Sequence, residues 1–139
     1  MTAKEYLLQI RRLDYKIRHR KAQYKKIMSA RAFYTSPAVD GDRVKASMSG
    51  AGFTAQSDKY LDMALDIVRS EQQLIAERFR IIRQIESLGD HGEVLYLVYV
   101  EYKNLMQAAQ VMGYSYSHTR HLHTAALAAF DRKYLHGTG

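Results

Sequence analysis

The sequence predicts an all-α protein in which a long antiparallel helical hairpin is followed by a C-terminal three-helix unit containing a helix-turn-helix. The 139 residues include one proline and no cysteine, and long runs rich in Leu, Ile, Lys, Arg and Gln carry apolar residues at helical spacing. Two such runs precede a glycine-containing break at 89–92, and shorter apolar segments follow it. We therefore expect a coiled-coil-like hairpin over 1–88 and a helix-turn-helix unit over 91–135.

The first expected helix runs from Thr2 to about Arg31. Thr2 followed by Glu5 has the pattern of a capping box, in which each side chain bonds the backbone N–H of the other residue. Apolar residues recur along this helix in a narrow seam, which favours packing against one partner helix. The seam consists of Ala3, Tyr6, Ile10, Leu13, Ile17, Tyr24 and Ile27, interrupted by Arg20.

The segment 35–57 interrupts the helical pattern and is expected to be a flexible loop. It contains the only proline and three of the eight glycines, in a stretch rich in Ser and Ala. A second helix is expected over 58–88, capped by Ser57 or Asp58. Its apolar stripe is wide enough to serve two neighbours, so we expect it to fold back on the first helix. The stripe includes Tyr60, Leu61, Ala64, Ile67, Val68, Leu74, Ile75, Ile81, Ile82, Ile85 and Leu88.

After the break at 89–92, the segment 93–103 alternates like a strand, but no second strand exists to pair with it. We therefore interpret it as the first helix of the C-terminal unit. The residues expected to face inward are Val94, Leu97, Val98 and Tyr102. The tail 131–139 is expected to fray.

Two short helices joined by a tight turn are expected over 105–130. Gly113 lies where a helix ends with positive φ, and Ser115 is a natural N-cap for the next helix. The inward positions are Leu105, Ala108, Ala109 and Met112 in the first helix and Thr119, Leu122, Ala126 and Phe130 in the second. This layout is typical of a helix-turn-helix, whose second helix can enter the DNA major groove. Helix–glycine–helix corners that bind no DNA are also common in all-α proteins. Residue spacing alone does not distinguish such a corner from a DNA-binding helix-turn-helix.

The outward face of the last helix would be the DNA-reading surface. It contains Tyr116, Ser117, Arg120, His121 and Thr124. Arg120 is the best candidate for a base contact because arginine can bond a guanine with two hydrogen bonds.

The net charge of +7 is unevenly distributed. Residues 1–31 contain ten Lys or Arg and two acids, whereas the part from His91 onward contains four Lys or Arg, three acids and five histidines. The exposed bases of the first helix would contact nucleic acid phosphates or, alternatively, form a solvated coiled-coil surface paired with acids on a neighbour. These bases are Arg11, Arg12, Lys16, Arg18, Lys21, Lys25 and Lys26. The apolar stripe is too narrow to favour a membrane-surface helix.

Several classes of function find no support in the sequence. The absence of cysteine excludes disulfides and thiolate zinc sites. His118, His121 and His123 lack a nearby carboxylate or an HExxH pattern, so no metal site or cofactor is expected. No paired carboxylates or nucleophile–base pattern indicates an enzyme. Because no apolar run approaches the ~18 residues of a membrane span and the N-terminus lacks a signal-peptide core, we expect a cytoplasmic protein.

Three stretches carry a resemblance to a known family: TAKEYLLQIRRLDYKI at the start, DRVKAS in the middle and AAQVMGYSYSHTRHLHTAAL near the end. They resemble small phage-encoded proteins of unknown function whose C-terminal helix-turn-helix is similar to region 4 of sigma-70 factors. Such proteins sit near regulators of phage late transcription, and some related members activate late genes. Ala109, Gly113 and Ser115 match the family's small residue, turn glycine and capping serine.

The resemblance implies a surface for double-stranded DNA. It assigns DNA contacts to Tyr116, Ser117, His118, Arg120 and His121, with Thr124 on a phosphate. Histidine and tyrosine here occupy positions at which typical members carry Lys or Arg. The expected function is therefore a DNA-binding phage transcription regulator in the host cytoplasm, with the hairpin forming a homodimer or docking on RNA polymerase. The alternative is a protein-binding helical adaptor, for example a phage assembly or host-takeover factor, which the near-neutral C-terminal unit favours.

Overall fold

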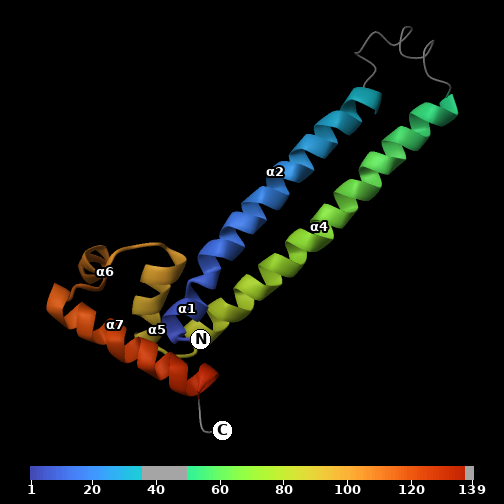
Figure 1. Ribbon diagram of the computed structural model, residues 1–139. Coiled ribbons are helices and arrows are strands. Elements are labelled where there is room, and N and C mark those ends of the chain that lie inside the picture. The colour runs from blue at the N-terminus through green and yellow to red at the C-terminus, as the bar shows by residue number, and fades with distance from the viewer. Residues whose placement is uncertain (36–49, 137–139) are drawn as a thin grey trace. The chain divides into compact units, whose positions relative to one another are not determined.

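The computed structural model describes the backbone of residues 1–35 and 50–136, and this part of the chain is helical with no strand (Figure 1). The expected all-α class is therefore confirmed for the described residues. The elements are α1 (Ala3–Leu7), α2 (Gln9–Thr35), α4 (Gly50–Glu86), α5 (Asp90–Leu95), η1 (Tyr96–Val100), α6 (Leu105–Met112), α7 (Tyr116–Phe130) and η2 (Asp131–Leu135). The elements η1 and η2 are short π-helical turns. The DRVKAS stretch and most of the expected loop lie outside the described residues.

The chain divides into two compact units. The head unit consists of Met1–Tyr15 and Ile75–Gly139, and the two-helix unit consists of Lys16–Leu74. This division differs from the expected boundary near residue 88. The physical reason is that the start of the first long helix and the end of the second share a core with the C-terminal helices, so both belong to the head unit.

The N-terminal helix differs from its expected form. Thr2 and Glu5 form the expected capping box, with Glu5 N–H 3.1 Å from Thr2 Oγ1 and Thr2 N 3.2 Å from Glu5 Oε2. However, the helix is interrupted at Leu8, whose carbonyl accepts the Arg11 N–H three residues on, 3.2 Å away. This tight turn separates α1 from α2, and α2 continues to Thr35, beyond the expected end at Arg31.

The second long helix begins earlier than expected. Gly50–Ser57, expected to be loop, is the first part of α4, and Ser57 is 6% exposed within the helix rather than capping it. The glycines suggested a loop, but this stretch contains alanines and no proline, so its local preference against helix is weak. The helix ends at Glu86, slightly before the expected Leu88.

In the two-helix unit, α2 and α4 run in opposite directions. Arg20 Nε donates to Ser70 Oγ at 2.9 Å, and the ring of Tyr34, further along α2, lies 5.6 Å from that of Tyr60, earlier in α4. Arg20, which interrupts the apolar seam, is accommodated because its guanidinium bonds Ser70 and also Gln23 at 3.2 Å.

The head unit contains most of the core. Its buried apolar residues come from both ends of the chain and from every element between Ile81 and Phe130. They are Ala3, Leu7, Ile10, Leu13, Ile81, Ile82, Ile85, Val94, Leu95, Leu97, Tyr99, Val100, Ala108, Ala109, Ala126 and Phe130. Phe130 at the end of α7 packs on Tyr6 of the first turn, with ring centroids 5.5 Å apart.

The first helix of the C-terminal unit begins at Asp90 rather than Glu93. Gly89, with φ +63°, precedes it, and Gly92 lies inside α5, buried against α4. A Cβ at Gly92 would lie 2.2 Å from the Ile85 carbonyl oxygen. Gly92 therefore permits close helix packing, whereas the sequence suggested only a break at this position.

Tyr102 does not face inward as expected. The helix ends at Val100, and Tyr102 has φ +60° and is 42% exposed. Its hydroxyl donates to the Asp14 carboxylate and its ring lies under the Arg11 guanidinium. Val94 and Leu97 are buried as expected, and Val98 is half-buried.

The tail is ordered for longer than expected. Instead of fraying from Asp131, the chain continues as η2 to Leu135. Tyr134 packs on Phe130 with ring centroids 5.1 Å apart, and its hydroxyl bonds that of Ser87 at 2.5 Å. The contacts with the buried Phe130 ring and with Ser87 stabilise the additional turn.

Candidate nucleic-acid interface

The turn between α6 and α7 is specified by residues within it. Gly113 ends α6 in the left-handed region (φ 75°, ψ 26°), and its N–H bonds the Ala109 carbonyl at 2.9 Å. Ser115 then caps α7, its Oγ accepting the His118 N–H at 3.1 Å. Both expected roles are confirmed. A capping box at the start of α6, formed by Asn104 and Gln107, was not expected, although the Asn–x–x–Gln spacing indicates one.

The inner faces of α6 and α7 fix how these helices pack. Ala108 and Ala109 are buried, as expected for inward positions. Thr119 is fully buried, and its hydroxyl is satisfied by donating to the Ser115 carbonyl at 2.9 Å. Ala126 and Phe130 complete the buried side of α7. The orientation of α7 is therefore determined by one side of the helix, and its other side takes no part in the core.

All six expected DNA-contacting residues lie on the exposed side of the first part of α7. They are Tyr116, Ser117, His118, Arg120, His121 and Thr124. The side chains of Arg120 and His121 make no hydrogen bond or ion pair with the described part of the chain. His118 contacts the Tyr114 ring edge-on at 4.7 Å, and the Thr124 hydroxyl donates to the Arg120 carbonyl at 3.2 Å.

His123 is separated from the other two histidines of this helix. It is half-buried and stacks on Tyr99, with Nε2 3.0 Å from the Tyr99 hydroxyl. Burial lowers the pKa of His123, and the charge of Lys4 lowers it further. Burial also raises the pKa of Tyr99. The helical spacing from Thr119 to His123 and Ala126 is the signal that could have assigned His123 to the inner side.

The seven basic residues expected to contact phosphates are all exposed. Arg11 and Arg12 belong to the head unit, whereas Lys16, Arg18, Lys21, Lys25 and Lys26 belong to the two-helix unit. Within the described residues none of the seven forms an ion pair. Between the described residues, the alternative of a basic helix paired with acids on its neighbour is therefore not observed for these seven side chains.

A charged cluster near Arg11 was not expected from the sequence. The Asp14 carboxylate accepts hydrogen bonds from Arg78 Nε, at 2.5 Å, and from the Tyr102 hydroxyl. Burial, the hydrogen bond to Asp14 and the charge of Asp14 raise the pKa of Tyr102 to about 12. Arg11 lies 5.1 Å from the Tyr102 ring centroid. The cluster joins residues far apart in sequence, so no local pattern indicates it.

No family model, curated protein or solved structure matches this chain. The described residues contain no group of three or more His, Asp or Glu side chains placed to hold a metal ion. None of the helices in the described ranges combines the length and apolar character needed to cross a membrane.

Proposed function

We propose that this chain is a DNA-binding transcription regulator of the phage type, in which α6, the Gly113–Ser115 turn and α7 form a helix-turn-helix similar to region 4 of sigma-70 factors. The observation that carries the proposal is the division of α7 into two sides. One side is buried in the core through Thr119, Ala126 and Phe130. The other side presents polar side chains that make few contacts within the described part of the chain. A recognition helix requires this arrangement.

In the proposed complex the first turns of α7 enter the major groove of double-stranded DNA. Arg120 bonds the O6 and N7 atoms of a guanine, which is the commonest specific contact of this kind. Tyr116, Ser117, His118 and His121 complete the reading surface, and Thr124 contacts a phosphate.

The exposed bases of α2 would add affinity that does not depend on sequence. In this proposal α2 and α4 form a long antiparallel hairpin that dimerises the protein or docks on RNA polymerase. The supporting observation is that the seven bases are exposed and form no ion pair within the described residues.

The test is selection of binding sites from a randomised DNA duplex, followed by fluorescence anisotropy on the selected sequence. Arg120→Ala should weaken specific binding by about 1 to 3 kcal/mol. The matched control is Arg132→Ala, which removes an exposed arginine of η2 outside the reading surface and should leave the sequence preference unchanged. The affinity of the unmodified chain should fall steeply with salt. If no sequence is enriched and no duplex binds at low salt, the proposal is wrong.

The second candidate function is a protein-binding helical adaptor without DNA binding. The observation that favours it is apolar exposure beside the reading surface: Met106 is 59% exposed and Val111 is 57% exposed, both on α6. Together with the near-neutral charge of this region, these side chains suit a protein partner. The absence of salt-sensitive DNA binding, with retained binding of a polymerase subunit or phage protein, would favour the adaptor.

A further inference from the structure

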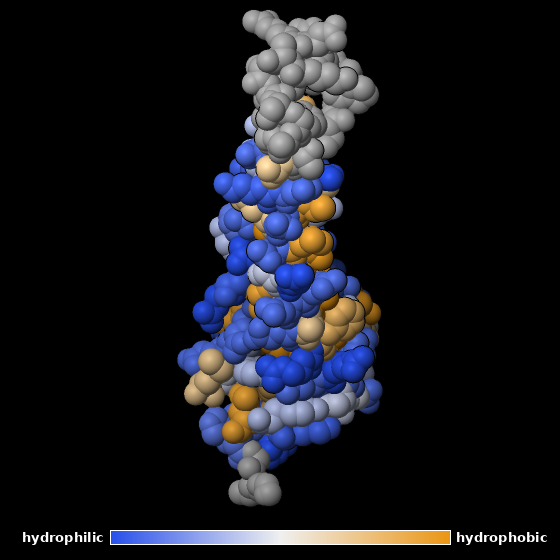
Figure 2. Space-filling view, turned by 90° about the vertical axis from the view of Figure 1, so that its right-hand side faces the viewer, coloured by the Kyte–Doolittle hydropathy of each residue, from blue (hydrophilic) through white to orange (hydrophobic). Residues whose placement is uncertain are grey.

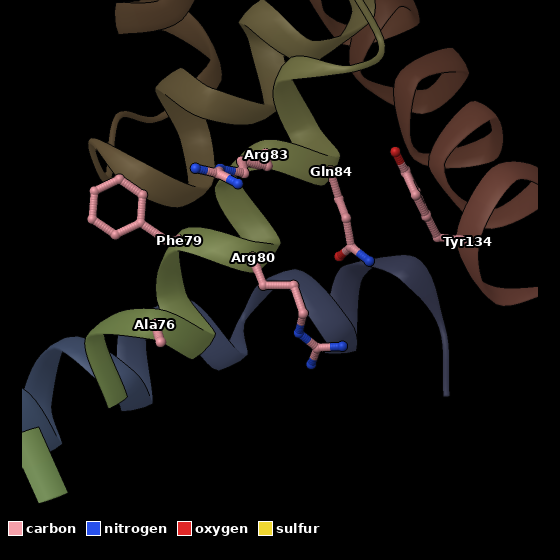
Figure 3. A pocket seen from close by; sticks show the side chains of 6 residues that line it. All are labelled: Ala76, Phe79, Arg80, Arg83, Gln84 and Tyr134. Carbon is pink, nitrogen blue, oxygen red and sulfur yellow. The ribbon is translucent and has the colours of Figure 1, made fainter. Parts of the chain in front are cut away.

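A cavity of about 480 Å³ lies in the head unit, formed by the last turns of α4 and by η2. Its lining consists of Ala76, Phe79, Arg80, Arg83, Gln84 and Tyr134. Figure 3 shows the Arg80 and Arg83 side chains leaving α4 in different directions, with Arg83 on the side of Phe79 and with Tyr134, from η2, on the opposite side beyond Gln84. We call this cavity the Arg80 pocket. None of its lining residues belongs to the proposed reading surface.

The polar groups of the Arg80 pocket are predominantly hydrogen-bond donors. Arg80 and Arg83 are exposed, and neither makes a hydrogen bond or an ion pair within the described residues. The Gln84 Oε1 atom accepts from the Tyr6 hydroxyl at 2.7 Å, so the amide NH₂ is the end that remains available. No carboxylate lines the pocket. Two cationic groups and an amide donor, with no acid among them, select for an anionic ligand.

The remaining lining is apolar and aromatic. Phe79 is 54% exposed, and the Tyr134 ring and Ala76 contribute further apolar surface. The Tyr134 hydroxyl forms a hydrogen bond with the Ser87 hydroxyl at 2.5 Å. Lys133 Nζ lies 5.4 Å from the Tyr134 ring centroid, and it donates a hydrogen bond to Ser87 Oγ at 3.1 Å. The ring of Tyr134 is thus held in place from two directions. Figure 2 shows one face of the molecule, on which hydrophobic residues are scattered among predominantly hydrophilic ones, and Phe79 is one of several exposed large hydrophobic side chains.

These two properties distinguish between anionic partners. The outside of a DNA duplex offers phosphates and sugars, which would satisfy the arginines but leave Phe79 exposed. An acidic peptide carrying an apolar side chain would satisfy both, because guanidinium groups bind carboxylates with two parallel hydrogen bonds. Arginine and aromatic residues are also enriched at the energetically important positions of protein interfaces.

We propose that the Arg80 pocket binds an acidic peptide segment of a protein partner, with carboxylates on Arg80 and Arg83 and an apolar side chain of the peptide against Phe79. This site is separate from the DNA-reading surface. Arg120 and Tyr134 lie about 20 Å apart along α7 and η2 at ~1.5 Å per residue. The proposal does not depend on DNA binding and can hold if the proposed function fails.

The test is an NMR titration of the full chain, labelled with ¹⁵N, using the N-acetylated peptide amide Asp-Glu-Phe-Asp-Glu as the probe. Binding in the millimolar range should shift the backbone amides around Phe79–Gln84 and Tyr134 and leave those of Tyr116–His121 unchanged. Arg80→Gln with Arg83→Gln should weaken binding by at least about tenfold, because both charge-assisted contacts are lost. Phe79→Ser should weaken binding of this peptide while leaving that of an Asp-Glu-Gly-Asp-Glu peptide unchanged.

The matched control is Arg69→Gln, which removes an exposed arginine of the same helix that pairs with Asp66 and is not among the residues that line the pocket. It should bind the probe as the unmodified chain does. The dispersion of each variant's own spectrum verifies that it is folded, and the single variant Arg83→Gln replaces the double variant if the latter unfolds. The proposal is wrong if the peptide causes no shifts, or if Lys-Lys-Phe-Lys-Lys causes equal shifts. It is also wrong if tripolyphosphate or a DNA duplex binds more strongly at the same amides. Shifts of these amides on simple dilution would overturn it as well, because they would indicate that a second copy of the chain occupies the pocket.

Discussion

The head unit and the two-helix unit differ in how completely they bury their apolar residues. In the head unit Phe130, Ile81 and Ile85 are fully buried, whereas in the two-helix unit Ile27 is only half-buried and Phe33 is exposed. A pair of helices has one contact seam, but the head unit packs several helices around a common core. The head unit can therefore hold side chains in defined positions, as a binding site requires, whereas the two-helix unit presents mainly charged surface.

The largest expected effect comes from removing the central ring of the head core. Phe130→Ala should lower the free energy of unfolding by about 3 to 5 kcal/mol, because Phe130 is fully buried and contacts Tyr6 and Tyr134. Ile27→Ala in the two-helix unit should cost clearly less, since its side chain is only half-buried. Urea denaturation followed by circular dichroism measures both. Equal losses would contradict the contrast between the units.

A second prediction separates two kinds of glycine in the head unit. Gly92→Ala should destabilise the protein by about 1 to 3 kcal/mol, because its Cβ would lie 2.2 Å from the Ile85 carbonyl oxygen and would push α5 away from α4. A Cβ at position 113 would meet no atom within 4 Å, so Gly113→Ala is opposed only by the positive φ of this residue. It should lower the free energy of unfolding by about 1 kcal/mol. Gly113→Asn should cost less than Gly113→Ala, because asparagine tolerates this conformation better. Thermal unfolding of the three variants tests the ranking, and a milder effect at Gly92 than at Gly113 would refute close packing there.

The smallest expected effect is a dependence of head-unit stability on pH. Since burial lowers the pKa of His123 in the folded protein, the unfolded chain binds the proton more readily. The stability contribution is therefore present above the ordinary histidine pKa of about 6.5 and is lost as the pH falls through the lower folded pKa. Hydrogen exchange of head-unit amides at pH 7.5 and at pH 5 measures this loss.

The control for this pH effect is His121→Asn, which changes an exposed histidine of the same helix and should leave the dependence intact. In His123→Phe the ring stacking on Tyr99 is retained but the titrating group is absent, so the part of the dependence due to His123 should disappear. An unchanged dependence in that variant would remove His123 as its origin.

The inner side of α7 and the exposure of five of its six candidate residues could be predicted from helical spacing, whereas His118 was expected at the surface only through the family resemblance. The apolar spacing of Thr119, Ala126 and Phe130 sets which side is buried, and the remaining positions follow from helical geometry. The contact of His123 with Tyr99 was not predicted, because histidine is counted as a polar residue in such a pattern. Its stacking on Tyr99, in η1, is a contact between two elements that helical spacing does not show.

The helix starts at the Thr2 and Ser115 caps were predicted correctly, whereas the predicted cap at Ser57 or Asp58 and the predicted fraying from Asp131 were wrong. The start of α4 at Gly50 and the continuation of η2 to Leu135 contradict what glycine content and nearness to the C-terminus suggested. In η2 the contact of Tyr134 with Ser87 supplies the missing stabilisation. In η2 a contact between residues distant in sequence thus outweighed a weak local preference.

By itself the sequence determined the helical class, the Thr2–Glu5 capping box, and the turn in which Gly113 and Ser115 join α6 to α7, because each depends on residues within about one helical turn. Other features depend on how the helices pack. Tertiary packing places Gly92 against the Ile85 carbonyl and brings both Arg78 and Tyr102 to the Asp14 carboxylate. It also brings Arg80 and Tyr134 to one pocket. Several of these pairs are tens of residues apart, and even the nearest joins two different helices. Which of many apolar or charged side chains meet is settled by how the helices pack around the head core, and the periodicity of a single helix carries no information about that.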